Sequence, residues 1–204
     1  MKRVHGGAVP VQNKFVEKSF NDKSHQFVAQ KDLIAQYAAS LVDEGDSIYL
    51  DSGTTTYEMI KYLKGKEIVV VTNGLSHVES LIEYNIPCFV LGGKVKQKTK
   101  AVVGYEAISA LHRYRFDKCF MGSNGVHSLH GCTTPDPEEA MIKENAIKAS
   151  NDIFILVDDS KFGEVSFTRF AEIGEATIIT NSDDDLTQYQ DKTTVKVVRK
   201  GFIR

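Results

Sequence analysis

A segment rich in hydroxyl side chains, Asp51-Ser52-Gly53-Thr54-Thr55-Thr56, directly follows the apolar run Ile48-Tyr49-Leu50. The apolar run predicts a buried strand, and a helix is expected to begin by Thr55 or Thr56. The turn between them would direct free backbone N–H groups and hydroxyl donors at one point, with the positive end of a helix dipole behind them. Such a turn can bind a phosphate, although an ordinary Ser/Thr helix cap would give the same pattern.

Any phosphate bound there is expected to be a lone monoester, as on a sugar. The sequence has neither a GxxxxGK[ST] loop nor a GxGxxG motif, so we expect no nucleotide cofactor. No Ser/His/Asp or Cys/His triad can be argued. The spacing of Cys119, His127, His130 and Cys132 matches no common zinc pattern, so we expect no metal site.

Two other groups of charged residues could contact an anionic ligand. Asp136, Pro137 and Glu139 predict a capping box, and Lys143 lies four residues after Glu139, where a solvated ion pair is the alternative. Lys161 follows a buried-strand pattern and could neutralise a phosphate, or simply belong to a polar loop.

A row of alternating lysines consists of Lys94, Lys96, Lys98 and Lys100. In an extended chain all four would share one face, as the rim of an anion site or a DNA-like contact. We favour the alternative, an edge strand protected by its charges against pairing with another strand.

Strand patterns alternate with helical patterns from residue 25 onward. Strands are predicted at 47–50, 67–72, 87–91, 116–121, 153–157 and 176–180, and helices at 25–43, 56–64, 74–84, 104–112 and 136–150. This alternation predicts an α/β fold with an open, mostly parallel sheet and helices on both faces.

Most of the predicted strands end in small or polar residues. These ends are Asp51-Ser52-Gly53-Thr54, Thr72-Asn73-Gly74, Gly92-Gly93-Lys94, Gly122-Ser123-Asn124-Gly125 and Asp158-Asp159-Ser160-Lys161. Ligands of open α/β sheets bind outside the carboxyl ends of the strands. Tight turns also favour such residues, but together these ends favour a polar small-molecule site.

Composition narrows the class of protein. The chain has 204 residues, 42% hydrophobic and 25% charged, enough for one large domain or two small ones. Its net charge of -2 provides no basic field for nucleic acid. Three widely spaced cysteines indicate a reducing compartment, and no membrane span or signal peptide is recognisable, so a cytoplasmic location is expected.

These motifs occur together in an order that resembles the DeoR family, bacterial transcriptional repressors of sugar metabolism. The segments that carry the resemblance are Arg3-Val4-His5-Gly6-Gly7-Ala8, Asp51 to Thr55, Thr72-Asn73, Gly92-Gly93, Val103-Gly104, Gly122 to Gly125, Gly131 to Thr134 and Asp158 to Gly163. The match covers essentially the whole chain.

The resemblance implies a fold like ribose-5-phosphate isomerase, glucosamine-6-phosphate deaminase and the CoA transferases. It implies an effector-binding domain over residues 22–204, preceded by a linker or arm over residues 1–21. The winged helix-turn-helix domain that binds operator DNA in the family is expected to lie outside this chain. The expected partners are a sugar phosphate effector, with fructose 1-phosphate favoured and tagatose 6-phosphate among those left open, and further copies of the chain in a dimer or tetramer.

The resemblance also implies roles for individual residues. Ser52, Gly53, Thr54 and Thr55 would hold the phosphate. The remaining pocket residues would be Asp51, Thr72, Asn73, Gly92, Lys96, Asn124, Glu139, Lys143 and Lys161. The chain departs from the family at Ser123 and His127, where Ala and Asp are common, which leaves the sugar-hydroxyl contacts of that loop open.

The alternative is a sugar-phosphate isomerase or a related enzyme. The Asp-x-Ser-Lys segment and the pair Glu138 and Glu139 resemble parts of ribose-phosphate isomerases, in which a carboxylate moves a proton beside the carbonyl. However, the Asp- and Gly-rich catalytic loop of those enzymes is replaced here by Gly122-Ser123-Asn124-Gly125. We therefore expect a sensor of sugar phosphate and not an enzyme.

Overall fold

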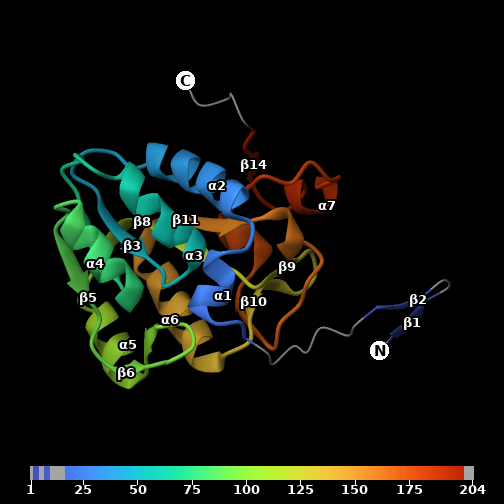
Figure 1. The fold of residues 1–204 in the computed structure, drawn as a ribbon, viewed down its shortest axis with the longest axis horizontal. Helices are drawn as coiled ribbons and strands as arrows, with labels where there is room; N and C mark the ends of the chain where they lie inside the picture. The colour runs from blue at the N-terminus through green and yellow to red at the C-terminus, as the bar shows by residue number, and fades with distance from the viewer. Residues whose placement is uncertain (1, 5–6, 10–16, 200–204) are drawn as a thin grey trace.

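A seven-stranded sheet forms the centre of the protein in a computed structural model that describes residues 2–4, 7–9 and 17–199 (Figure 1). Every pair of neighbouring strands in this sheet is parallel. In spatial order the strands are β14 (Val195–Val197), β13 (Thr177–Thr180), β11 (Ser150–Val157), β8 (Phe116–Gly122), β3 (Ser47–Leu50), β4 (Val69–Thr72) and β5 (Cys88–Val90). The predicted parallel α/β sheet is confirmed.

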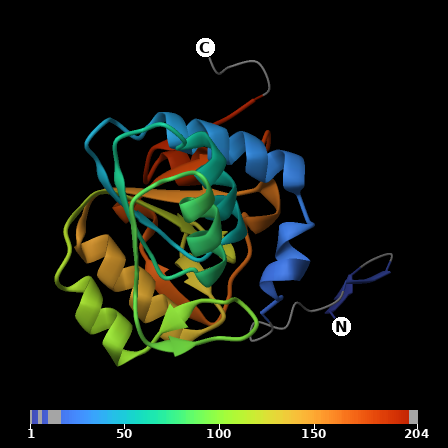
Figure 2. The same ribbon diagram turned by 60° about the vertical axis from the view of Figure 1, so that its left-hand side comes forward.

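Helices cover both faces of the sheet, as predicted (Figures 1 and 2). One face packs on α2 (Val28–Ser40), α3 (Thr54–Met59) and α4 (Leu75–Glu83), and the other on α5 (Tyr105–Leu111) and α6 (Pro137–Lys148). Side chains alternate along each strand: in β8, Phe120 joins the first core, and Cys119 and Met121 join the second. Because both faces are buried, the strands are nearly continuous apolar runs.

The strand order reverses direction beside β3. The chain continues from β3 to β4 and β5 on one side, and later places β8, β11, β13 and β14 on the other side. The carboxyl ends of β3 and β8, which are neighbours, therefore form the switch point at which open α/β sheets bind ligands.

Short strands outside the main sheet were not predicted. A three-stranded antiparallel sheet contains β9 (Gly125–His127), β10 (Gly131–Thr134) and β12 (Thr168–Ala171), and lies beyond the end of β8. Two hairpins are formed by β1 (Lys2–Val4) with β2 (Gly7–Val9), and by β6 (Lys94–Val95) with β7 (Val102–Val103). The remaining elements are α1 (Phe20–Ser24), α7 (Thr187–Gln190) and 3-10 turns at Ile60–Tyr62, Asp159–Lys161 and Ile173–Glu175.

The predicted helix boundaries need correction in two places. The helix expected from residue 25 begins only at Val28, because Phe27 has a left-handed φ of 54°. The helix expected from Thr56 begins earlier, at Thr54, and after Met59 it tightens into a 3-10 turn.

The expected extended lysine row is wrong. The strand holds only Lys94 and Val95, and the chain then turns, with a left-handed φ of 54° at Lys100. The lysines therefore do not share one face, and Lys96 points to buried carboxylates.

Helix α1 begins at Phe20, inside the segment 1–21 that is expected to form the arm. The Phe20 ring is buried edge-on against Tyr57 of α3. Residues 1, 5, 6 and 10–16 of the expected arm lie outside the described residues. Within the described part of the chain, no helix is both long enough and apolar enough to span a bilayer.

Candidate ligand-binding site

A cavity of about 480 Å³ opens at the carboxyl ends of β3, β8 and β11. Its walls also include the N-terminal ends of α3 and α6 and the segment around α1 and the start of α2. It contains most of the residues expected at the site, namely Asp51, Ser52, Gly53, Thr54, Thr55, Asn124, Glu139, Lys143 and Lys161.

The turn between β3 and α3 presents backbone donors to this cavity. Gly53 is the N-cap and supplies no side-chain acceptor, and the first helical bond runs from Tyr57 N–H to the Gly53 carbonyl at 3.0 Å. The amides of Thr54 and Thr55 before it therefore have no acceptor within the helix. Thr56 stabilises the turn, because its hydroxyl lies 2.6 Å from the Asp51 carbonyl oxygen and can donate to it.

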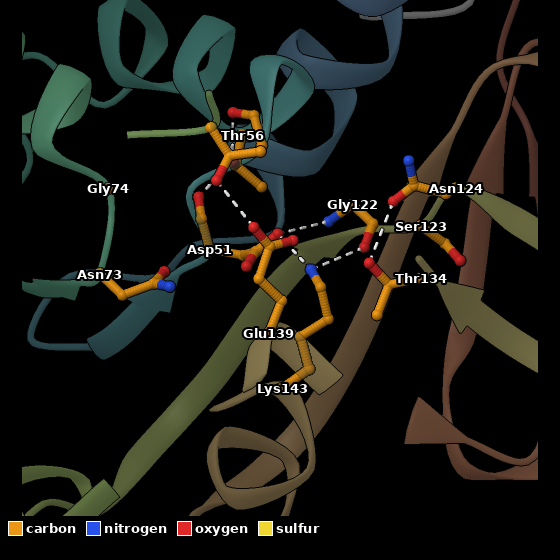
Figure 3. A network of polar contacts seen from close by, with 12 residues as sticks. Asp51, Thr56, Asn73, Gly74, Gly122, Ser123, Asn124, Thr134, Glu139 and Lys143 are labelled. Atoms are coloured by element: carbon orange, nitrogen blue, oxygen red, sulfur yellow. Dashed lines mark hydrogen bonds and ion pairs between the residues drawn. The ribbon is translucent and has the colours of Figure 1, made fainter. Parts of the chain in front are cut away.

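A buried ion pair joins two strand ends to α6 (Figure 3). The Lys143 ammonium lies 2.5 Å from Asp51 Oδ2 and donates to the Gly122 carbonyl at 3.0 Å. Asp51 Oδ2 also accepts from the Gly122 N–H at 3.3 Å. Both charged side chains are nearly inaccessible, so the pair holds β3, β8 and α6 in register and adds no free charge to the cavity.

Glu139 and Lys143 do not pair with each other. Glu139 instead accepts hydrogen bonds from Lys96 and from the Thr99 hydroxyl, each at 2.7 Å. Asp136 caps α6 as predicted, by accepting from the Glu138 and Glu139 amides, but the reciprocal bond of a capping box is absent because the Glu139 carboxylate turns to Lys96.

Lys161 is a partly exposed cation on the cavity wall. Its ammonium lies 3.1 Å from both carboxylate oxygens of Asp158 and 2.6 Å from the Ser160 hydroxyl. It also lies 5.3 Å from the centre of the Phe27 ring. With 27% of its side chain exposed, Lys161 can reach a ligand without leaving Asp158.

Lys31 is a cavity residue that sequence reasoning missed. It lies on α2, is only 5% exposed, and donates to the backbone carbonyl of Lys23. Burial lowers the pKa of Lys31 to about 8, with the Asp158 charge opposing and the Lys161 charge adding to this shift. Lys31 comes three residues before Ile34 and four before Ala35, so the helical spacing places it on the buried face of α2. This spacing is the signal in the sequence that could have identified Lys31.

Four residues expected in the pocket do not line the cavity. The Thr72 hydroxyl donates to the Leu50 carbonyl between neighbouring strands, and the Asn73 amide donates to the Val102 carbonyl. Gly92 lies in open surroundings at an exposed position. Lys96 sits behind the wall, where the carboxylates of Glu139, Asp136 and Glu17 surround it and, against the effect of burial, raise its pKa.

Ser123, Asp158 and Ser160, from two of the polar strand ends, also line the cavity. The cavity residues that were not predicted are Glu17, Lys18, Lys23, Gln26, Phe27, Thr99, Pro135, Leu156, Val157, Glu164, Val165 and Ser166. Ser123, at the position where the family differs, donates its hydroxyl to the backbone at Gly125 or Thr133, which stabilises the loop.

The histidines and cysteines form no metal centre in the part of the chain that the structure describes, where no cluster of three or more His, Cys, Asp or Glu side chains could hold a metal ion. Cys119 and Cys132 lie in the core, and burial raises the pKa of each thiol to about 12. The rings of His127 and His130 contact each other, with centroids 4.7 Å apart.

Comparison with known proteins gives a consistent family match. The model of the DeoR C terminal sensor domain matches residues 26–182. The uncharacterized HTH-type transcriptional regulator FruR of Bacillus subtilis is 51% identical over 98% of this chain and 80% of its own length. The HTH-type transcriptional regulator GlpR of Haloferax volcanii is 35% identical over 86% and 69%, and the lactose phosphotransferase system repressor of Staphylococcus aureus is 30% identical over 98% and 78%.

Solved structures with a similar fold are more distant. The eIF2B delta subunit of Chaetomium thermophilum matches with a TM-score of 0.51 and 16% identity, over 68% of this chain and 50% of its own. Ribose 5-phosphate isomerase A of Neisseria gonorrhoeae matches with a TM-score of 0.49 and 21% identity, over 67% and 53%. This chain thus spans about half the length of these solved chains, and the eIF2B match shows the fold alone.

Proposed function

This chain belongs to the DeoR family of transcriptional regulators, and we propose that its sensor domain binds a sugar phosphate in the cavity at the ends of β3, β8 and β11. Its named relatives are transcriptional regulators, and this chain is likewise a regulator and not an enzyme. The relatives are HTH-type regulators, among them a sugar-system repressor, so the chain is part of a repressor of sugar metabolism.

One observation carries the proposal: donors suited to a phosphate line a single cavity. The first-turn amides of α3, the partly exposed ammonium of Lys161 and the buried ammonium of Lys31 all belong to its wall. Backbone N–H groups and lysines are the groups that bind phosphate monoesters in proteins. We assign the phosphate of the effector to these groups.

We assign recognition of the sugar hydroxyls to Asn124 and Glu139. The Asn124 side-chain oxygen lies 3.3 Å from the Thr134 hydroxyl and can accept from it, whereas its amide N–H₂ has no acceptor among the described residues. Glu139 accepts hydrogen bonds from Lys96 and from the Thr99 hydroxyl, which fix the position of its carboxylate in the cavity wall. The resemblance of the motifs to regulators of fructose operons favours fructose 1-phosphate as the ligand.

The sensor would act by binding the sugar phosphate more tightly in one conformation than in another. We propose that residues 22–204 are the effector domain and residues 1–21 the arm that transmits this preference. An operator-binding domain outside this chain would respond to the change of conformation. We propose that the regulator is a cytoplasmic dimer or tetramer.

A thermal-shift screen tests the proposal. Fructose 1-phosphate, fructose 6-phosphate, tagatose 6-phosphate and glucose 6-phosphate would be compared with fructose and inorganic phosphate. A ligand at a hundred times its Kd stabilises the folded state by about 2.7 kcal/mol, which raises the Tm of a domain of this size by several degrees. We expect one ester to exceed both fructose and phosphate. Equal shifts with all compounds, or none, would remove the proposal.

A further inference from the structure

Glu17 places a carboxylate from the N-terminal segment in the wall of the cavity. It lies at the start of the described stretch 17–199, and its side chain is only 8% exposed. Lys18, Lys23, Gln26 and Phe27 extend the same wall. The segment that joins the body of the domain thus forms one side of the site at which we place the effector.

Two lysines hold Glu17 there. One carboxylate oxygen lies 3.1 Å from the Lys96 ammonium, and the other lies 3.4 Å from the Lys23 ammonium. Lys23 lines the cavity with its side chain 26% exposed, and its backbone carbonyl accepts from Lys31. Lys23 is therefore a partner of Glu17 that a ligand in the cavity can also reach.

Of the carboxylates around Lys96, Glu17 is the one whose partners among the described residues are all lysine ammonium groups. Asp136 also accepts from two backbone amides of α6, and Glu139 also accepts from the Thr99 hydroxyl. Among the described residues, Glu17 has only lysine partners. Burial and, after it, the charge of Glu17 raise the pKa of Glu139, so the two carboxylates oppose each other across one lysine.

We propose that Glu17 is an internal competitor of the effector, a carboxylate latch that an anionic ligand releases by drawing Lys23 to itself. This inference rests on the proposed function. A phosphate near Lys23 removes one of the two cations that compensate the buried Glu17 carboxylate, and a buried carboxylate without a counter-charge is costly.

Release of Glu17 would loosen a defined part of the chain. Near Glu17 the segment is also attached by the Phe20 N–H, which donates to the Lys98 carbonyl at 2.8 Å, and by the buried Phe20 ring. Lys98 belongs to the loop that carries Lys96, so movement of Glu17 and Lys96 acts directly on this bond. The latch thereby connects occupancy of the cavity to the N-terminal side of the domain.

The test compares Glu17→Gln with Glu83→Gln, which removes an exposed carboxylate that has no hydrogen-bond or ion-pair partner among the described residues. Affinity for the sugar phosphate that most raises the Tm is measured by calorimetry, and exchange of the Phe20 amide by NMR. We expect Glu17→Gln to bind on the order of tenfold more tightly, a typical coupling between sites, and Glu83→Gln to match the unsubstituted chain. Glu17→Asp, which keeps the charge on a shorter side chain, should lie between the two.

In the unsubstituted chain, ligand should speed exchange of the Phe20 amide. Equal or weaker binding by Glu17→Gln, or a Phe20 amide that ligand protects, would overturn the latch and leave the sugar phosphate site standing. If no ester binds the unsubstituted chain at all, the proposed function and the latch both fail.

Discussion

Lys143 and Asp51 form an ion pair in which the ammonium and a carboxylate oxygen are 2.5 Å apart and both side chains are at least 94% buried. The two residues come from α6 and from the end of β3, and they are 92 positions apart in the sequence. Their pairing replaces the local pair of Glu139 with Lys143 that the helical spacing suggested. The buried pair therefore belongs to the framework of the cavity.

Removing one member of this pair should cost much more than removing both. Lys143→Met leaves the Asp51 carboxylate buried without its cation, and we expect about 3–5 kcal/mol loss in the free energy of unfolding. The double variant Asp51→Asn with Lys143→Met should recover a large part of this loss, measured by urea unfolding.

The control is Lys61, an exposed lysine that pairs with Asp32 at 2.6 Å and with Glu58 at 2.9 Å. Lys61→Met should cost no more than about 1 kcal/mol, because solvent screens exposed pairs. Similar losses for Lys61→Met and Lys143→Met would contradict the buried role of the Asp51 pair.

Lys161→Ala should weaken binding of the sugar phosphate, because it removes a partly exposed cation from the cavity wall. Loss of a hydrogen bond to a charged group costs about 1.5–3 kcal/mol, or about ten- to a hundredfold in Kd. Thr54→Ala should have a smaller effect, since backbone amides persist in it. Calorimetry with Lys64→Ala, an exposed lysine away from the cavity, provides the control. Unchanged binding in both cavity variants would remove the phosphate assignment.

Binding should weaken in alkaline solution because of Lys31. Burial brings the pKa of Lys31 to about 8, so its positive charge is present below that pH and lost above it. We expect affinity to fall by up to about tenfold per pH unit above 8 if the charge contacts the phosphate.

The same pKa predicts an opposite trend for stability. The pKa in the folded state lies below the usual lysine value, so the unfolded chain holds more protons between about pH 8 and 10.5. The contribution of Lys31 to stability therefore improves as pH rises there.

The control for the affinity prediction is Lys31→Arg, which stays charged and should lose the alkaline fall in affinity. A fall that persists in Lys31→Arg would assign it to another group.

Gly74→Ala should disturb the turn between β3 and α3, because Gly74 follows the neighbouring strand β4 and packs against that turn. A Cβ at Gly74 would lie 2.9 Å from the Ser52 Cα and 2.5 Å from His77 Nδ1, so the backbone at Ser52 must shift. Overpacking of this kind costs about 1–3 kcal/mol, and ligand affinity should fall with it. Gly92→Ala is the control because a Cβ there meets no atom within 4 Å, and its stability should change by less than about 0.5 kcal/mol. A neutral Gly74→Ala would show that the turn adapts.

Local sequence patterns were sufficient for the main elements of the fold. The apolar run Ile48 to Leu50 is β3, and the hydroxyl-rich turn after it opens a helix, because strand and helix periodicities are read from neighbouring residues. The antiparallel sheet of β9, β10 and β12 was missed, since its short strands carry little pattern of their own and β12 pairs with β10 from about forty residues away.

The alternation of elements, the polar strand ends and the family could be recognised from the residues alone. Which charges are available at the site depends on the packed structure. Lys96 lies among carboxylates behind the wall, Lys143 is neutralised by Asp51, and Lys31 enters the cavity from a helix that carried no functional motif. The reason is physical: burial and pairing fix the partners of a charged side chain, and both depend on which distant segments the packed sheet brings together.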